Sequence, residues 1–365
     1  MGMRKTYGAR TPFRLAIALG SGVFLAVASG EIGLRLFFPI TFDESIILDA
    51  EGNRTPLADI VKATARSPKG EGRALSMRHC YDRPRWAYFD GEGCVSVRSN
   101  SLGLRHEEIG PRTPGDFRVL AIGDSFTFGM GVRQQDTWVK QLESLLGAQH
   151  HSQVEVINAG LAEGAHEPTR YAAWLAETGL SLQPDLVVVG FCLNDIHRSV
   201  AMAKLAPALR EPWLGGKSQI LLRLQLHLRR RNYERRQARD PELLKEQEAF
   251  FVTHEGGVWA TRRAALVEMK ERLDERGIRF LIAILPMMTR LAGDYPYRRL
   301  HAEVRRFCEE AGIEFVDLLE PMLSFVDGLE DYSETQLWVH PTDQHPAPPA
   351  HRVFAEGIQR YLSEP

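Results

Sequence analysis

Short runs of almost unbroken apolar residues alternate with amphipathic segments through the last two-thirds of the chain. The clearest runs are residues 117–122 and 186–191. A strand that is apolar on both faces must be covered on both faces, which is typical of a parallel sheet between two layers of helices. The pattern therefore predicts an α/β fold. The expected strands are 117–122, 154–158, 186–191, 278–285 and 314–318, and the expected helices are 137–146, 168–178, 259–276, 297–310 and 350–362.

The N-terminus has the pattern of a segment that enters a membrane. Four basic residues precede an apolar stretch from Leu15 to about Ala28. A cleavable signal peptide fits this pattern, with Ala26-Val27-Ala28 as the small residues before the cut and a secreted product. An uncleaved anchor over 13–34 with the positive charges inside fits as well, and we favour it. Either one places the rest of the chain outside the cytoplasm, which is the periplasm for an anchored bacterial domain. The basic residues are Arg4, Lys5, Arg10 and Arg14.

The chain accordingly divides into three parts. Residues 1–40 are the N-terminal membrane anchor or signal segment, and residues 41–114 are a polar juxtamembrane connector with short strands around 86–89 and 95–97. Residues 115–365 are the α/β domain, interrupted by an insert at about 197–256. Within this insert, residues 221–239 mix arginines with apolar residues. Such a basic amphipathic helix can touch an anionic membrane or a polyanion, although a solvated helix face is the commoner meaning.

Charge and cysteine content exclude several classes of protein. The 45 Lys and Arg residues nearly balance the 47 Asp and Glu residues, which gives a net charge of -2. This balance argues against nucleic acid as a partner, because a phosphate backbone needs a cationic surface. The four cysteines have no paired C-x-x-C spacing, so we expect no structural zinc. Cys80 and Cys94 can form a disulfide if the chain is exported, and Cys192 and Cys308 fit buried thiols.

Polar residues follow three of the predicted strands, at the point where each strand ends. They are Gly123-Asp124-Ser125, Asn158-Ala159-Gly160 and Asn194-Asp195. Because the carboxyl ends of parallel strands meet at one edge of a sheet, we expect these residues to line one pocket. Gly123-Asp124-Ser125 is also compatible with a simple helix cap. A catalytic interpretation of the three segments therefore depends on whether the chain also supplies a base.

His345, near the C-terminus, is the candidate general base for Ser125. The Ser125 hydroxyl can act as a nucleophile if a base takes its proton, and neutral imidazole does so near physiological pH. Asp343 can orient the ring and stabilise its charged form. The N–H groups of Ser125 and Gly160 and the side-chain amide of Asn194 can stabilise an oxyanion. No metal is implied, because these positions lack helical i, i+4 ligand spacing, and no cofactor is expected.

Other acidic residues and histidines near these segments are weaker candidates for a catalytic role. Asp124 is expected to cap the helix after the first strand, and Asp195 to hydrogen-bond the loop around it. Asp317, at the end of the fifth strand, is a candidate to orient the loop of the catalytic histidine. His340 is also followed by proline, but it lacks a preceding acid, so we expect a surface loop or a substrate contact there. His351 is expected to pack or hydrogen-bond within the last helix.

Ser125, Gly160, Asn194 and His345 occur in the order of the four marker residues of the SGNH (GDSL-type) hydrolases. The chain resembles this family, in its membrane-anchored bacterial form, over about residues 98–363 apart from the insert. The resemblance implies a three-layer αβα sandwich with a flavodoxin-like parallel sheet, to which this chain adds an N-terminal membrane helix.

Two positions depart from the family pattern. Cys192 stands where the third block of the family has glycine, and the nearest glycine is Gly190. The acid, Asp343, precedes His345 by two residues, whereas the family places it three residues before the histidine. A Ser–His dyad without a dedicated acid is therefore an alternative to the triad.

The resemblance and the predicted location together imply a function. We expect a serine esterase that works through an acyl-enzyme on an acylated small molecule or glycan, in particular on O-acyl or O-acetyl groups of a cell-envelope or exported glycan. The membrane would be its other partner, through the N-terminal helix. Two alternatives remain open: an O-acyltransferase to a glycan, and a catalytically silent glycan-binding or scaffold protein on the same fold.

Overall fold

The computed structural model describes residues 10–37, 46–48, 76–81, 84–149, 153–161, 167–196, 218–221, 223–224, 258–293, 295–340 and 343–364. The chain forms two compact units. One contains Met1–Phe42 and Lys204–Pro241, and the other contains Asp43–Ala203 and Glu242–Pro365.

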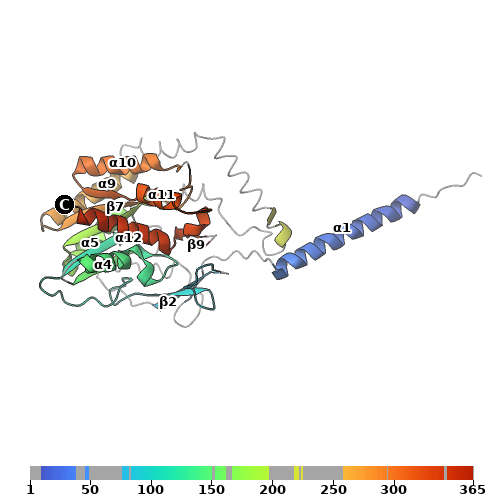
Figure 1. Ribbon diagram of the computed structural model, residues 1–365, viewed down its shortest axis with the longest axis horizontal. Helices are drawn as coiled ribbons and strands as arrows, with labels where there is room; N and C mark the ends of the chain where they lie inside the picture. Colours follow the sequence, from blue (N-terminus) through green and yellow to red (C-terminus); the bar gives the residue numbers. More distant parts are fainter. Residues whose placement is uncertain are drawn as a thin grey trace, which may run out of the picture. The chain divides into compact units, whose positions relative to one another are not determined.

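A five-stranded parallel sheet forms the centre of the larger unit (Figure 1). Its order is β5-β4-β6-β7-β8, and every neighbouring pair is parallel. All five predicted strands are confirmed, with ends that differ by no more than two residues. The strands are β4 (Phe117–Gly123), β5 (Val154–Gly160), β6 (Leu186–Cys192), β7 (Arg279–Leu285) and β8 (Glu314–Asp317).

Helices cover both faces of this sheet, which confirms the predicted αβα sandwich (Figure 1). On one face α4 packs against α12, and α11 also packs against α12. On the other face α5 packs against α9, and Trp259 of α9 meets Phe307 of α10 edge-on. The helices are α4 (Trp138–Gln149), α5 (Pro168–Glu177), α9 (Val258–Asp274), α10 (Arg298–Ala311), α11 (Leu319–Asp327) and α12 (Pro348–Ser363).

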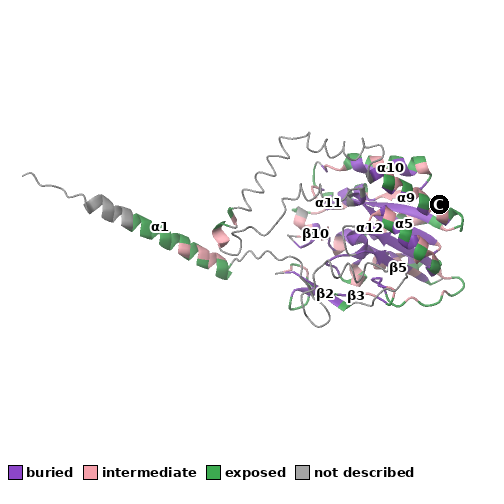
Figure 2. Cartoon of the chain, turned by 180° about the vertical axis from the view of Figure 1, so that it is seen from behind, coloured by how far each residue is buried: buried purple, intermediate pink, exposed green. Residues whose placement is uncertain are grey.

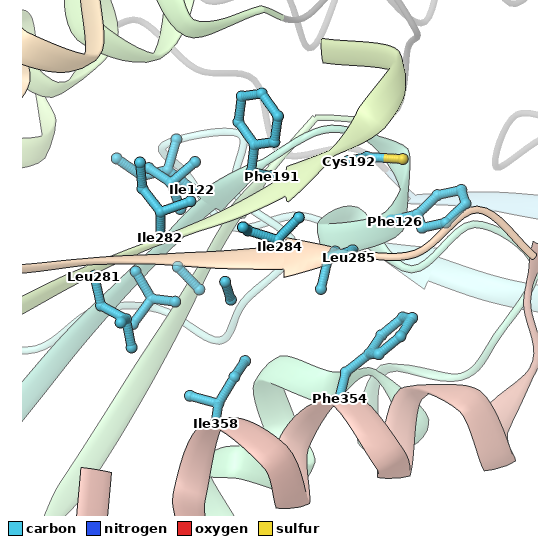
Figure 3. Close-up of a cluster of buried hydrophobic side chains, with 14 of the residues drawn as sticks. Ile122, Phe126, Phe191, Cys192, Leu281, Ile282, Ile284, Leu285, Phe354 and Ile358 are labelled. Atoms are coloured by element: carbon cyan, nitrogen blue, oxygen red, sulfur yellow. The ribbon is translucent and has the colours of Figure 1, made fainter. Parts of the chain in front are cut away.

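The core lies between these layers, and β4, β5, β6 and β7 are buried along almost their whole length (Figure 2). Phe354 and Ile358, one turn apart on α12, point toward the sheet (Figure 3). Phe191 of β6 meets Trp259 of α9 on the opposite side. Residues on both faces of the central strands β4, β6 and β7 are therefore inside, as the unbroken apolar runs require, whereas the edge strand β8 is only partly buried.

A small antiparallel sheet belongs to the same unit. It contains β1 (Ile46–Leu48), β2 (Ser76–Cys80) and β3 (Cys94–Arg98), and Cys80 and Cys94 form the anticipated disulfide. The strand expected around 95–97 lies within β3, whereas 86–89 forms a turn instead of a strand. The segment predicted as a connector thus carries structure that packs onto the α/β layers through a cluster of buried side chains. This cluster contains Tyr81, Phe89, Val95, Val132 and Val339.

The smaller unit contains α1 (Arg10–Phe37). Its residues Ala18–Phe37 are long and apolar enough to cross a membrane, and large apolar side chains such as Phe24 and Leu36 are exposed. Glu31 accepts hydrogen bonds from the N–H groups of Gln219 and Ile220, in a short helical stretch of the insert. Most of the basic segment 221–239 lies outside the described residues.

Candidate active site

The turn after β4 presents Ser125 at the carboxyl edge of the sheet. β4 ends at Gly123, and α3 (Ser125–Phe128) begins two residues later. Asp124 is the N-cap of α3, because its Oδ1 accepts from the N–H of Phe126 at 2.9 Å. This confirms the capping role predicted for Asp124 and makes Ser125 the first residue of α3, where a backbone N–H has no partner within its helix.

Glycines let α3 rest directly on the ends of the strands. Gly123 pairs with Gly160 of β5 on one side and with Gly190 of β6 on the other. A Cβ at Gly123 or Gly190 would overlap the side chain of Thr127, and one at Gly160 would overlap the backbone of Phe128. Close approach of the helix therefore requires glycine at all three strand ends.

The N–H of Gly160 has a partner inside the protein. It donates to Oδ1 of Asn158 at 2.9 Å, while Nδ2 of Asn158 donates to the carbonyl of Thr127 at 3.1 Å. That the Gly160 N–H also stabilises an oxyanion stays a prediction, in which the oxyanion would replace or share the Asn158 acceptor. Gly160 serves the packing of α3, and Asn158 ties the end of β5 to the same helix.

A hairpin near the C-terminus brings His345 to Ser125. It contains β9 (Trp338–His340) and β10 (Asp343–Pro346), paired antiparallel. Nε2 of His345 lies 2.9 Å from Oγ of Ser125, and Nδ1 lies 2.5 Å from Oδ1 of Asp343. With Nδ1–H donating to the carboxylate, Nε2 accepts from the serine hydroxyl. The structure thus brings together Ser125, His345 and Asp343, in the geometry of a serine–histidine–acid triad.

The pKa values of His345 and Asp343 shift in opposite directions. Burial lowers the pKa of His345, but the Asp343 carboxylate raises it by more, so the net pKa lies above its ordinary value. Burial raises the pKa of Asp343, but the His345 charge and hydrogen bonds from His345 and Tyr81 hold it well below its ordinary value. An ionised acid beside a more basic imidazole suits general base catalysis.

Tyr81 is a residue of this site that the sequence did not reveal. It follows β2 directly, and its hydroxyl donates to Oδ2 of Asp343 at 2.6 Å. The two residues are 262 positions apart in the chain. No local sequence pattern predicts a contact over this separation. The one related signal in the sequence is that Tyr81 follows Cys80, a cysteine able to form a disulfide.

The end of β6 approaches the same edge of the sheet. Asn194 lies in a short 3-10 turn, η3 (Leu193–Ile196), although its side chain lies outside the described part of the structure. Asp195 in the same turn accepts from the Tyr171 hydroxyl at 2.9 Å and from the N–H of Cys192 at 3.2 Å. The prediction that Asp195 hydrogen-bonds the loop beside Asn194 is therefore confirmed. Burial and the charge of Asp124 raise the pKa of Asp195 well above its ordinary value.

Two histidines differ from expectation. His340 is only 8% exposed and stacks on Tyr81 with ring centroids 5.1 Å apart, so the expected surface loop is wrong. His351 is fully buried, and its Nδ1 accepts from the N–H of Trp138 at 3.1 Å. It therefore ties α12 to the first residue of α4, instead of bonding within its own helix.

Asp317 does not orient the His345 loop, contrary to prediction. Its Oδ1 lies 2.7 Å from Nδ1 of the buried His301 and accepts from the N–H of Leu319. It joins α10 to the start of α11. Cys192 and Cys308 are buried thiols, as expected.

Residues 100–105, which precede β4 in the chain, support the loop that follows α3. Arg105 is 1% exposed, and its guanidinium donates to the carbonyls of Phe128, Gly129 and Val132. Burial lowers the pKa of Arg105 to about 10. A fixed fork of donors suits several carbonyls at once, so Arg105 holds the chain where it leaves α3.

Comparison with known proteins agrees with this geometry. The model of the GDSL-like lipase/acylhydrolase family matches residues 121–345, which hold the three residues of the triad geometry. A search of curated protein sequences gives no match.

Solved structures with low sequence identity also align. LAE5, an α/β hydrolase from the metagenome of Lake Arreo, is 18% identical, with 68% of this chain and 97% of that chain covered and a TM-score of 0.42. A putative lipolytic protein of the G-D-S-L family from Desulfitobacterium hafniense is 17% identical, with 67% and 98% covered and a TM-score of 0.37. Axe2, an acetylxylan esterase from Geobacillus stearothermophilus, is 16% identical, with 68% and 95% covered and a TM-score of 0.41.

The family match spans more than half of the chain and runs from the strand before Ser125 to His345. The chain belongs to the GDSL-like lipase/acylhydrolase family and is an ester-hydrolysing enzyme.

Proposed function

We propose that this enzyme is a membrane-tethered serine esterase that works through an acyl-enzyme. The observation that carries the proposal is the chain of contacts from Ser125 Oγ to His345 Nε2 and from His345 Nδ1 to Asp343. His345 takes the proton of the Ser125 hydroxyl as Oγ attacks the ester carbonyl. The same histidine then gives that proton to the departing alcohol, and water attacks the acyl-enzyme to release the acid.

The oxyanion of the tetrahedral intermediate needs donors at the carboxyl edge of the sheet. The N–H of Ser125, at the first position of α3, is one candidate. The side-chain amide of Asn194, in the turn after β6, is another. The N–H of Gly160, at the end of β5, is the third, and the oxyanion would replace or share its Asn158 acceptor.

The substrate we propose is an O-acyl or O-acetyl group on a cell-envelope or exported glycan. Two features support a location outside the cytoplasm. The apolar helix Ala18–Phe37 can hold the chain at a membrane or direct its export. The Cys80–Cys94 disulfide is typical of oxidising compartments such as the periplasm.

Labelling with a fluorophosphonate tests the nucleophile without knowledge of the substrate. The probe phosphonylates an activated serine: Oγ forms the new O–P bond, fluoride leaves, and His345 takes the hydroxyl proton. We expect wild type to be labelled and Ser125→Ala to lose labelling. Ser144→Ala, at an exposed serine of α4, is the matched control and should be labelled like wild type. Undiminished labelling of Ser125→Ala would overturn the assignment.

Hydrolysis of p-nitrophenyl acetate with and without a glycan acceptor then tests the reaction. An esterase releases free acetate in both cases. Transfer of the acetyl group to the glycan at saturating acceptor would instead show an acyltransferase. A labelled serine without turnover of any acyl ester would contradict the proposed esterase.

A further inference from the structure

The carboxylate of Asp343 is held from two sides. Its Oδ1 accepts from His345 twice, from Nδ1 at 2.5 Å and from the backbone N–H at 3.1 Å. Its Oδ2 accepts from the Tyr81 hydroxyl at 2.6 Å. The Asp343 side chain is 16% exposed, so an oxygen without a partner there would be a mostly buried unpaired acceptor. Tyr81 supplies that partner.

Tyr81 comes from outside residues 121–345, the segment that the family model matches. It stands directly after β2 and beside the Cys80–Cys94 disulfide, and its N–H donates to the carbonyl of Gly93 at 2.9 Å. The β2–β3 hairpin therefore fixes the backbone of Tyr81 on both sides.

Aromatic packing fixes the ring of Tyr81. His340 stacks against it with a centroid distance of 5.1 Å and an interplanar angle of 20°, and His79 lies tilted against it at 4.6 Å and 34°. Phe89 meets it edge-on, at 5.6 Å and 83°. A ring held by three neighbours at 4% exposure has little rotational freedom.

The loop after α3 is shaped to admit the hydroxyl. Gly131 has φ of +71°, and a Cβ at this position would lie 2.7 Å from the Tyr81 hydroxyl and 3.0 Å from Cβ of Val339. Burial and the Asp343 charge raise the pKa of Tyr81 well above its ordinary value, so the hydroxyl keeps its proton and remains a donor.

We propose that Tyr81 is a positioning residue of the esterase reaction, which holds the Asp343 carboxylate so that Oδ1 faces Nδ1 of His345. This rests on the proposed function of the triad. Without the hydroxyl, only the two hydrogen bonds from His345 restrain the carboxylate, so its orientation is less fixed and its hold on the imidazolium weakens. The hairpin of residues 76–98 is then part of the active site.

Tyr81→Phe tests this, because it keeps the ring and removes only the donor. We expect kcat for p-nitrophenyl acetate to fall about tenfold or more, the scale of a hydrogen bond to a charged group, with little change in KM. The acid limb of the kcat/KM profile should move to lower pH, because an unheld Asp343 stabilises the His345 imidazolium less. The other titratable groups around this cluster are Asp124, His79, His340, His351, Tyr88 and Arg105, none of which Tyr81→Phe alters.

Tyr88→Phe is the matched control. Its hydroxyl donates to the carbonyl of Gly131 at 2.8 Å, so it removes a hydrogen bond from the same hairpin to the same loop without touching Asp343. We expect its acid limb to coincide with that of wild type. An equal shift in Tyr88→Phe, or an unshifted limb and unchanged kcat in Tyr81→Phe, would overturn the inference.

A second background shows whether Tyr81 acts through Asp343. In the Asp343→Asn background, adding Tyr81→Phe should leave the residual rate almost unaltered. If it lowers this rate by the same factor as in wild type, the two residues act independently and the proposal is contradicted. Thermal unfolding of each variant confirms that it is folded. A wild type that neither hydrolyses the ester nor takes the fluorophosphonate would overturn the proposed function itself, and this inference with it. If wild type is active and Tyr81→Phe has the same kcat and the same acid limb, only the role of Tyr81 is overturned.

Discussion

Asp343 and His345 lie two residues apart on β10, and Oδ1 of the first is 2.5 Å from Nδ1 of the second. Side chains two residues apart on a strand point to the same side. The two side chains therefore meet on one side of β10, which gives a physical reason why an acid two residues before the histidine can contact its ring here.

Asp343→Asn should strongly reduce turnover. An amide that presents N–H to Nδ1 favours the wrong tautomer of His345, and in other triads this change lowers kcat by about 10³–10⁴-fold. The pKa of His345 is raised mainly by Asp343 against burial, so wild type loses activity as the pH falls through this raised value. In the variant we expect the acid limb of kcat/KM to lie at lower pH.

The control for this change is Asp327→Asn, at the exposed end of α11, which should retain wild-type rates and the wild-type limb. A dyad that does not use the acid would give Asp343→Asn a rate within about threefold of wild type, and that result would contradict the triad.

Gly160→Ala should disturb α3 and lower the rate of fluorophosphonate labelling. The added Cβ would overlap the backbone of Phe128, which cannot move away as a side chain would. Overpacking of this kind destabilises by about 1–3 kcal/mol, which urea unfolding can measure. Because the N–H of Gly160 remains in place, loss of labelling here would reflect displacement of Ser125.

Gly147→Ala is the matched control, since nothing lies within 4 Å of the added Cβ on α4. Removing a glycine from a helix should raise stability by roughly 0.5–1 kcal/mol. Equal stability losses in both variants would contradict the account of Gly160.

The parts of this fold that were predictable are those set by local sequence. The strand 186–191 was evident because it is apolar on both faces, and Asp124 was evident as a cap because capping acts over two residues. The order of Ser125, Asn194 and His345 further narrowed the chemistry. These signals can be interpreted without knowing which distant segments of the chain are in contact in the fold.

The features that the sequence did not predict depend on contacts between distant segments. Tyr81 reaches Asp343 across 262 residues, and His340 is buried because the same tyrosine stacks on it. Asp317 was assigned to the wrong histidine, because only the packing of α10 against β8 brings His301 to it. Gly160 lies at the strand end as predicted, whereas the hydrogen bond of its N–H to Asn158 depends on a side-chain rotamer that the sequence does not specify.

Loss of the Cys80–Cys94 disulfide should destabilise the larger unit. The disulfide closes a loop with a sequence separation of 14, and loops of about this length contribute about 3 kcal/mol. Urea unfolding with and without reductant measures this difference. The double variant Cys80→Ser/Cys94→Ser is the control, because reductant should no longer change its unfolding midpoint. The other two cysteines are buried and form no disulfide, so a reductant effect that persists in the double variant would contradict the assignment.

Removal of residues 10–37 should release the enzyme from the membrane while its esterase rate is retained. The exposed apolar side chains of Ala18–Phe37 provide the length and surface of a membrane span, and all residues of the triad geometry belong to the other unit. We expect full-length protein to remain in the membrane fraction after alkaline carbonate extraction and the shortened protein to be soluble. The mass of the mature full-length protein distinguishes an uncleaved anchor from a signal peptide cut after Ala28. A mature chain that begins at Ser29 and is found in the soluble fraction would contradict the anchor.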